Sequence, residues 1–119
     1  MNVINTIQKL SLFNDYWNPR IIGELNGQHV KIAKLLGEFV WHKHDDEDEL
    51  FYVIKGELKI EFRDKTVVLK EGEFIIIPRG VEHKPSAEKE VYIMLFEPCS
   101  TKNTGNLTND LTKLNLEKL

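Results

Sequence analysis

The sequence contains almost no cysteine, because Cys99 is the only one among its 119 residues. No intrachain disulfide can form, which excludes a fold held together by internal disulfides. Nothing next to Cys99 in the sequence would activate its thiol, so we expect this side chain to be inert packing.

Long apolar runs and clusters of basic residues are also absent. No stretch approaches the ~20 consecutive apolar residues that cross a bilayer. The N-terminal segment MNVINTIQKLSLFNDYW has polar residues where a signal peptide would be continuously apolar. Acidic residues outnumber basic ones by 19 to 16, for a net charge of −3, and no basic stripe is available to neutralise phosphates. We therefore expect a cytoplasmic protein that binds neither membranes nor nucleic acid.

What is present is the composition of a soluble protein with an apolar core, since 41% of the residues are hydrophobic and 29% are charged. A chain of this length is enough for one ordinary domain and too short for two. We expect a single domain over residues 1–119, with a core at about 22–98 and a C-terminal tail at 99–119.

Alternation of apolar and polar residues predicts strands through the middle of the chain. In ELKIEF, residues 57–62, every second residue is apolar, as in a strand with one buried and one wet face. The polar residues 63–65 form a turn before the β-branched run TVVLK, so a hairpin is expected here. Many short strands separated by glycines, without a convincing helix, predict an all-β fold.

Two later runs and the two ends of the chain differ from this pattern. FIIIP (74–78) and VYIMLF (91–96) are apolar on both faces, which predicts strands covered on both sides by a second sheet or by a partner subunit. Near the N-terminus, Val3, Ile4, Ile7 and Leu10 predict one or two helical turns. The stretch after Pro98, rich in Thr, Asn and Lys, is expected to be either a mobile tail or an arm that packs on a partner.

Three of the four histidines stand where a metal site requires them. His42 and His44 are two residues apart, so on a strand both imidazoles point to the same side. Glu49 opens the apolar run ELFYVI, where an unpaired carboxylate would be costly to bury unless it binds a metal. His83 follows the tight turn at Gly80. By contrast, we expect His29 to be a surface or hydrogen-bonded histidine and Asp45–Asp48 to be a solvated loop.

Two segments resemble the conserved motifs of the cupin family. The segment 37–56, GEFVWHKHDDEDELFYVIKG, is similar to the first motif: Gly, His-x-His, four residues, Glu, six residues, Gly. The segment 72–83, GEFIIIPRGVEH, is similar to the second motif: Gly, five residues, Pro-x-Gly, two residues, His. Four residues separate Gly37 from His42 where the family usually has five, and Ala87 stands where the family often has Asn. Neither departure removes a ligand.

The resemblance implies a jelly-roll β-barrel of two antiparallel sheets, with short helical or irregular extensions at its ends. It implies that His42, His44, Glu49 and His83 bind one divalent transition metal. Three imidazoles and one carboxylate suit Fe, Mn, Ni, Co or Zn without distinguishing among them. An octahedral ion would keep two positions open for water, substrate or dioxygen, which is typical of a site built for chemistry.

Flanking segments extend the resemblance over nearly the whole chain. FNDYWNPRIIGELNG before the barrel and EPCSTKNTGN after it are similar to a group of small single-domain microbial cupins whose reaction is uncharacterised. A homodimer is a common state of the family, and together with the two-faced apolar runs this predicts that the chain is a homodimer.

The family includes dioxygenases, isomerases and non-catalytic proteins, so the fold does not determine the function. We expect a small dioxygenase- or isomerase-like metalloenzyme that acts on a small oxygen-bearing substrate. Its pocket would be lined by inward-facing side chains: Phe51, Val53, Leu58, Ile60 and Phe62.

Other outcomes remain open at this stage. No acid or base is evident beyond the ligands, and Arg79 and Lys84 are the only nearby cations for a sugar phosphate, with Arg79 expected to be an exposed turn residue. The alternative is a non-catalytic protein in which the metal anchors a small ligand for binding or sensing. A metal-free structural barrel is a third possibility, and the four intact ligands argue against it.

Overall fold

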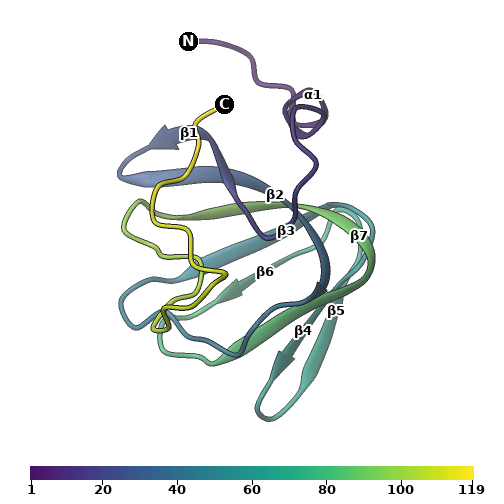
Figure 1. Cartoon of the computed structure of the whole chain (residues 1–119), viewed down its shortest axis with the longest axis vertical. Coiled ribbons are helices and arrows are strands. Elements are labelled where there is room, and N and C mark those ends of the chain that lie inside the picture. The colour runs from purple at the N-terminus through teal and green to yellow at the C-terminus, as the bar shows by residue number, and fades with distance from the viewer.

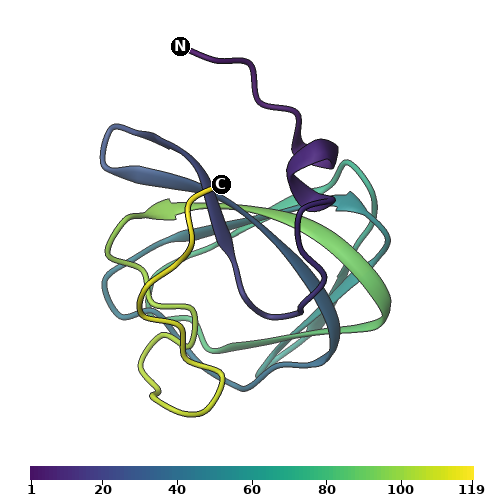
Figure 2. The same ribbon diagram turned by 45° about the horizontal axis from the view of Figure 1, so that its top comes forward.

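The computed structural model describes residues 1–119 and contains one short helix and seven strands. The elements are α1 (Thr6–Leu10), β1 (Arg20–Leu25), β2 (Gln28–Glu38), β3 (Glu49–Lys55), β4 (Leu58–Phe62), β5 (Thr66–Leu69), β6 (Phe74–Ile77) and β7 (His83–Pro98). Every pair of neighbouring strands is antiparallel, and the strands close into a barrel (Figures 1 and 2). The all-β prediction is therefore confirmed.

The long strand β7 connects the two layers of the barrel. Its second half pairs with β2 on one side and β3 on the other, and β6 extends this layer from β3. Its first half pairs with β4, which in turn pairs with β5. Between the halves, residues 88–90 are exposed. A strand of 16 residues can serve both layers in this way because it bends across the barrel (Figure 1).

The predicted hairpin is confirmed as β4 and β5, which pair from Leu58 with Leu69 to Glu61 with Thr66. Leu58 and Ile60, predicted to share a face, are both completely buried. They belong to a cluster of buried apolar side chains drawn from both layers: Ala33, Leu35, Phe51, Val53, Leu58, Ile60, Leu69, Ile77, Ala87, Val91, Ile93 and Leu95. This cluster is the apolar core of the barrel.

Within the chain, the two-faced apolar runs are fully covered on one face only. On β6, Phe74 and Ile76 are 58% and 55% exposed. Along β7 from Val91, the alternate side chains that point outwards are half-buried. The second sheet of the barrel covers the inner face of this layer, and nothing in the same chain covers the outer face of β6.

The N-terminal segment covers part of the outer surface near β1 and β2. The predicted helical turn is α1, and the side chain of Asn5 caps it by accepting a hydrogen bond from the Gln8 backbone N–H at 2.9 Å. Only Leu10 of the helix is buried, in a second small cluster with Phe13, Ile22 and Ile32. No helix of the protein is both long enough and apolar enough to cross a membrane, and the cytoplasmic location stays a prediction.

The C-terminal segment after β7 packs on its own barrel, unlike the mobile tail or partner-bound arm that we expected. It runs back along the barrel towards β1 (yellow in Figures 1 and 2). Ile21 exchanges backbone hydrogen bonds with Glu117 and Leu119, both at 2.9 Å. Thr104 is completely buried, and a Cβ added to Gly105, which has a φ of +58°, would lie 2.1 Å from the carbonyl oxygen of Lys43. The glycine therefore allows the segment to lie directly against the loop that carries His42 and His44.

Candidate metal centre

The backbone between β2 and β3 brings His42 next to His83. The two residues form an isolated antiparallel bridge, in which each backbone N–H donates to the other carbonyl at 3.0 and 2.9 Å. The segment is not the regular strand that the sequence predicted. The reason lies in its partners, because the backbone of Lys43 pairs with Asn106 of the C-terminal segment and the carbonyl of His44 accepts from Gly80.

The structure brings all four predicted ligand residues together. Glu49 is the first residue of β3, as predicted. The donor atoms of His42, His44, Glu49 and His83 all lie within 4.8 Å of one another. Each of the four residues is at most 4% exposed. The four residues therefore form a buried potential metal-binding site.

The hydrogen bonds of two imidazoles orient their other nitrogen towards this cluster. The Nδ1 atoms of His42 and His83 each lie 2.9 Å from a backbone carbonyl, that of Val40 and that of Val81 respectively. A carbonyl only accepts, so Nδ1 carries the hydrogen and Nε2 keeps its lone pair. Burial and the nearby His83 lower the pKa of His42 to about 4. The imidazole of His42 is therefore neutral at pH 7, as a metal ligand must be.

Several buried polar atoms in the cluster have no hydrogen-bond partner. They include Nε2 of His44, Nε2 of His83 and Oε1 of Glu49. Oε1 of Glu49 lies 3.3 Å from Nε2 of His44 and 3.4 Å from Nε2 of His83. Bonds of about 2.0–2.2 Å to one transition metal place neighbouring ligand atoms roughly 3.0–3.4 Å apart. The donors therefore fit a divalent metal, which would also satisfy the buried polar atoms that are otherwise costly.

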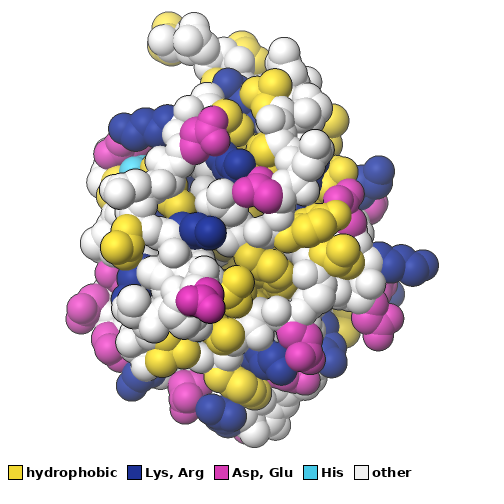
Figure 3. Space-filling model, in the orientation of Figure 1, with side chains coloured by type: hydrophobic (Ala, Val, Ile, Leu, Met, Phe, Trp, Pro, Cys, Tyr) yellow, Lys and Arg dark blue, Asp and Glu magenta, His cyan; other side chains and the backbone are white.

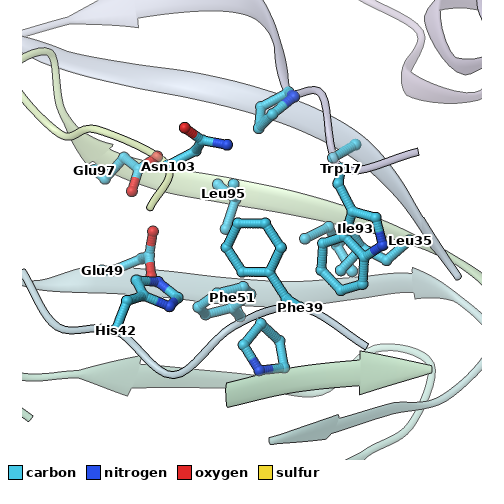
Figure 4. Close-up of a pocket in the computed structure, with 13 residues that line it drawn as sticks. Trp17, Leu35, Phe39, His42, Glu49, Phe51, Ile93, Leu95, Glu97 and Asn103 are labelled. Atoms are coloured by element: carbon cyan, nitrogen blue, oxygen red, sulfur yellow. The ribbon is translucent and has the colours of Figure 1, made fainter. Parts of the chain in front are cut away.

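A buried ion pair that the sequence interpretation missed lies beside Glu49. Lys31 and Glu97 are both 2% exposed, and Nζ of Lys31 lies 2.9 Å from Oε1 of Glu97. Glu97 lies beside Glu49 (Figure 4). Burial and the charge of Glu49 raise the pKa of Glu97 well above its usual value. Burial also acts to raise the pKa of Glu49, but contacts with Glu97, His44 and His83 outweigh it and hold that pKa well below the usual value.

The alternation of side chains along a strand could have indicated that Lys31 and Glu97 point inwards. Glu97 follows Leu95 by two residues on β7, and Lys31 precedes Ala33 by two on β2, so both share a face with core residues. The expectation that no acid or base accompanies the ligands is therefore wrong. The nearby cations considered from the sequence are elsewhere: Arg79 is an exposed turn residue, as expected, and Lys84 lies 3.4 Å from Glu38.

A small cavity of about 40 Å³ adjoins the cluster. Its polar end is formed by His42, Glu49, Glu97 and Asn103, and its other walls include Trp17, Leu35, Phe39, Phe51, Ile93 and Leu95 (Figure 4). The rings of Trp17 and Phe39 stack with centroids 4.7 Å apart, and the indole N–H donates to the Leu36 carbonyl at 2.8 Å. A space of this size has room for roughly three water molecules.

Only one of the residues predicted to line the pocket does so. Phe51 belongs to the apolar core and also lines the cavity. Val53, Leu58 and Ile60 belong to the same core without lining the cavity, and Phe62 packs against it. Pointing inwards is therefore not enough to reach the cavity. Asn103 and Trp17, which do line it, come from segments outside the two cupin-like motifs.

The fold and the site together are those of a cupin. Residues 29–97 match the Cupin_2 family model, described as a cupin domain, and the chain belongs to this family. The crystal structure of a cupin-2 domain containing protein from Shewanella frigidimarina NCIMB 400 is 53% identical in sequence. It superposes with a TM-score of 0.80, covering 81% of this chain and 94% of that chain.

Curated relatives match over shorter stretches. The uncharacterised protein YdbB of Bacillus subtilis is 48% identical over 64 residues, which cover 53% of this chain and 57% of that protein. An acireductone dioxygenase of Puccinia graminis is 26% identical over 103 residues, covering 76% of this chain and 54% of the relative. A 3-hydroxyanthranilate 3,4-dioxygenase of Bacillus cereus is 34% identical over 68 residues, covering 53% and 37%. The chain thus spans little more than half the length of the first two relatives.

Proposed function

We propose that the protein is a small metal-dependent enzyme of the dioxygenase type that acts on a small oxygen-bearing substrate. The observation that carries this proposal is the position of the cavity. Two of the four ligand residues, His42 and Glu49, line it on one side, and apolar and aromatic side chains line it on the other. A bound ligand would therefore place a polar atom at the metal cluster and its carbon atoms against Phe39, Phe51 and Leu95.

His42, His44, Glu49 and His83 would hold the ion, which is one of Fe, Mn, Ni, Co or Zn. When bound, such an ion acts as a Lewis acid towards a substrate oxygen or, if it is redox-active, supplies the chemistry with dioxygen. Other residues form the surroundings of the four ligands. Trp17 and Phe39 form a stacked aromatic wall of the cavity, while Lys31 and Glu97 are hydrogen-bonded to each other beside Glu49.

Two observations favour the dioxygenase type over a sugar-phosphate isomerase. Four of the distant relatives carry dioxygenase names, among them those from Puccinia graminis and Bacillus cereus. A sugar phosphate needs cations in the pocket, and the buried cation beside this cavity, Lys31, is already paired with Glu97 at 2.9 Å. The cavity walls supply aromatic and aliphatic side chains in the places where a phosphate would need donors.

The alternative is a non-catalytic protein that binds or senses a small ligand through the metal. The small volume of the cavity, about 40 Å³, favours it, because a substrate and dioxygen together need more room than a few water molecules. In this case the same four residues hold the ion, and the bound ligand leaves unchanged.

The test combines metal analysis with turnover. The purified protein is assayed for bound metal, and its iron- and manganese-loaded forms are mixed with diketones, hydroxy acids and sugar phosphates while dissolved oxygen is recorded. We expect close to one metal ion in the barrel site of each chain and oxygen consumption with one substrate class. Glu49→Ala should abolish both, and Glu47→Gln, a loop carboxylate two residues away, is the matched control.

The outcomes separate the two functions. Full metal occupancy without oxygen consumption or substrate conversion in the whole panel would contradict the enzyme proposal and favour ligand binding. A protein that retains no iron, manganese, nickel, cobalt or zinc after loading would contradict both functions.

A further inference from the structure

A second group of potential ligands lies where β1, β2 and β7 end side by side. Glu24 of β1 is the direct cross-strand partner of His29 on β2, and His29 is the partner of Glu97 on β7. Directly opposed residues of an antiparallel pair place their side chains on the same face. Cys99 follows Glu97 by two residues, and its backbone N–H donates to the carbonyl of Gly27 at 3.0 Å. The β1–β2 turn thereby holds Cys99 beside the other two side chains.

The donor atoms of these three residues have nearly the separations of a metal coordination sphere. Sγ of Cys99 lies 3.4 Å from Oε1 of Glu24, and Nε2 of His29 lies 3.9 Å from Oε2 of the same carboxylate. All three donors lie within 4.8 Å of one another. A tetrahedral zinc ion with bonds of about 2.3 Å to sulfur and 2.0–2.1 Å to nitrogen and oxygen has ligand separations of roughly 3.3–3.5 Å. Small side-chain rotations would close the site.

The surroundings of the group suit a cation. Burial and the charge of Lys31 hold the pKa of His29 below its usual value, so the imidazole is neutral at pH 7. Its Nδ1 atom is buried without a hydrogen-bond partner. Nζ of Lys31 is hydrogen-bonded to Glu97 at 2.9 Å, and both Lys31 and Lys118 are cations near His29 that oppose binding. Cys99 is exposed and unbonded to another sulfur, so its thiol is accessible.

We propose that Glu24, His29 and Cys99 form a second metal site, separate from the barrel site, that binds one borderline or soft divalent ion such as Zn²⁺. Three protein ligands leave the fourth tetrahedral position to water. A thiolate selects softer metals than a site of imidazoles and carboxylate does, so the two sites of the chain differ in metal preference. Binding releases the thiol proton, because the thiolate is the ligand, and the affinity therefore rises with pH. This proposal does not depend on the proposed function.

Cobalt provides a specific probe, because Cys99 is the only cysteine of the chain. A thiolate bound to Co²⁺ gives an intense near-ultraviolet charge-transfer band, and the barrel site has no sulfur ligand that could produce it. Metal-free protein, kept reduced without thiol reagents, is titrated with Co²⁺ while this band is recorded. We expect the band to saturate at one equivalent of Co²⁺ beyond any cobalt taken up by the barrel site. Added Zn²⁺ should displace the bound Co²⁺ and remove the band.

Six variants determine the origin of the band. We expect Cys99→Ser to abolish it, and His29→Gln and Glu24→Gln each to weaken the affinity by at least about tenfold. The barrel variant His42→Ala/His83→Ala should keep the band, which separates this site from the first. Ser100→Ala, a change at the neighbouring exposed position, is the matched control and should titrate like the unaltered protein. Absence of the band in a tenfold excess of Co²⁺ would overturn the proposal. A band of unchanged affinity in a His29→Gln/Glu24→Gln variant would also overturn it, because an isolated thiol would then explain the binding.

Discussion

The two ends of the barrel interior are built from the same three strands yet differ completely in chemistry. At one end of the interior, the inward-facing residues are Glu49 of β3, Glu97 of β7 and Lys31 of β2. At the other end, the same strands place Val53, Val91 and Leu35 on this inner face. All of these residues are at most 4% exposed. One end of the interior is therefore charged and the other is purely apolar, at equal burial.

This difference separates the source of stability from the candidate functional site. Burying one Val, Leu or Ile side chain contributes about 1.5–3 kcal/mol, so the apolar end stabilises the barrel. Buried polar atoms without partners cost free energy, and several of them lie at the charged end. A protein keeps such a costly arrangement where a ligand compensates for it. On the face shown in Figure 3, charges of both signs are interspersed with apolar side chains.

The largest effect is expected at the charged end. The double variant His42→Ala/His83→Ala leaves two of the four ligands, so metal in the barrel site should fall below about a tenth of the unaltered occupancy. Elemental analysis of the purified variant, with Cys99→Ser in the background to remove the second site, measures this. A double variant with full occupancy would contradict the assignment of the ligands.

At the apolar end the loss should appear in stability and leave metal binding unchanged. Ile60 is completely buried in the core, so Ile60→Ala should lower the free energy of unfolding by about 2–5 kcal/mol. Metal bound per folded molecule should stay the same. Urea unfolding of the metal-free protein checks the first expectation. Lys59→Ala, on the exposed face of the same strand, should change stability by less than about 0.5 kcal/mol. An equal loss in both variants would remove the distinction between the ends.

Variants of the buried pair Lys31 and Glu97, at the charged end, test whether the two side chains depend on each other for stability. Lys31→Met leaves Glu97 without its cation, so the free energy of unfolding should fall by about 3 kcal/mol. This is the lower part of the range for broken buried pairs, because Glu97 can take up a proton. The double variant Lys31→Met/Glu97→Gln should recover more than half of the loss. Urea unfolding of both variants and of Glu97→Gln completes the cycle, and an absence of recovery would show that the two side chains are not coupled.

The smallest effect on the folded chain is expected on the outer face of β6. Phe74 and Ile76 are exposed there, and their cross-strand neighbours Tyr52 and Leu50 extend the apolar surface onto β3. Together they support the predicted homodimer, which a second copy packed on this face would form. Phe74→Glu/Ile76→Lys should convert a dimer into a monomer while changing the unfolding free energy of the isolated chain by less than about 0.5 kcal/mol. Light scattering at micromolar concentration measures the mass, and a monomeric unaltered protein would contradict the dimer.

Much of the fold and of the candidate site was predictable from local patterns. Period-two alternation identified the β4–β5 hairpin and the inward direction of Leu58 and Ile60. Motif spacing selected the four ligand residues, and the structure brings their donor atoms within 4.8 Å of one another. The hairpin inference succeeds because the direction of a strand side chain depends on its immediate backbone alone.

The sequence by itself determined which side chains point inwards, whereas only the tertiary structure decided which of them meet. Lys31 and Glu97 are 66 positions apart, and their pairing depends on the register of β2 against β7. The cavity at one end of the barrel, its contact with Asn103, and the packing of the C-terminal segment depend on how the barrel closes. Closure and register are set by many weak contacts between distant segments, and no local pattern contains their sum.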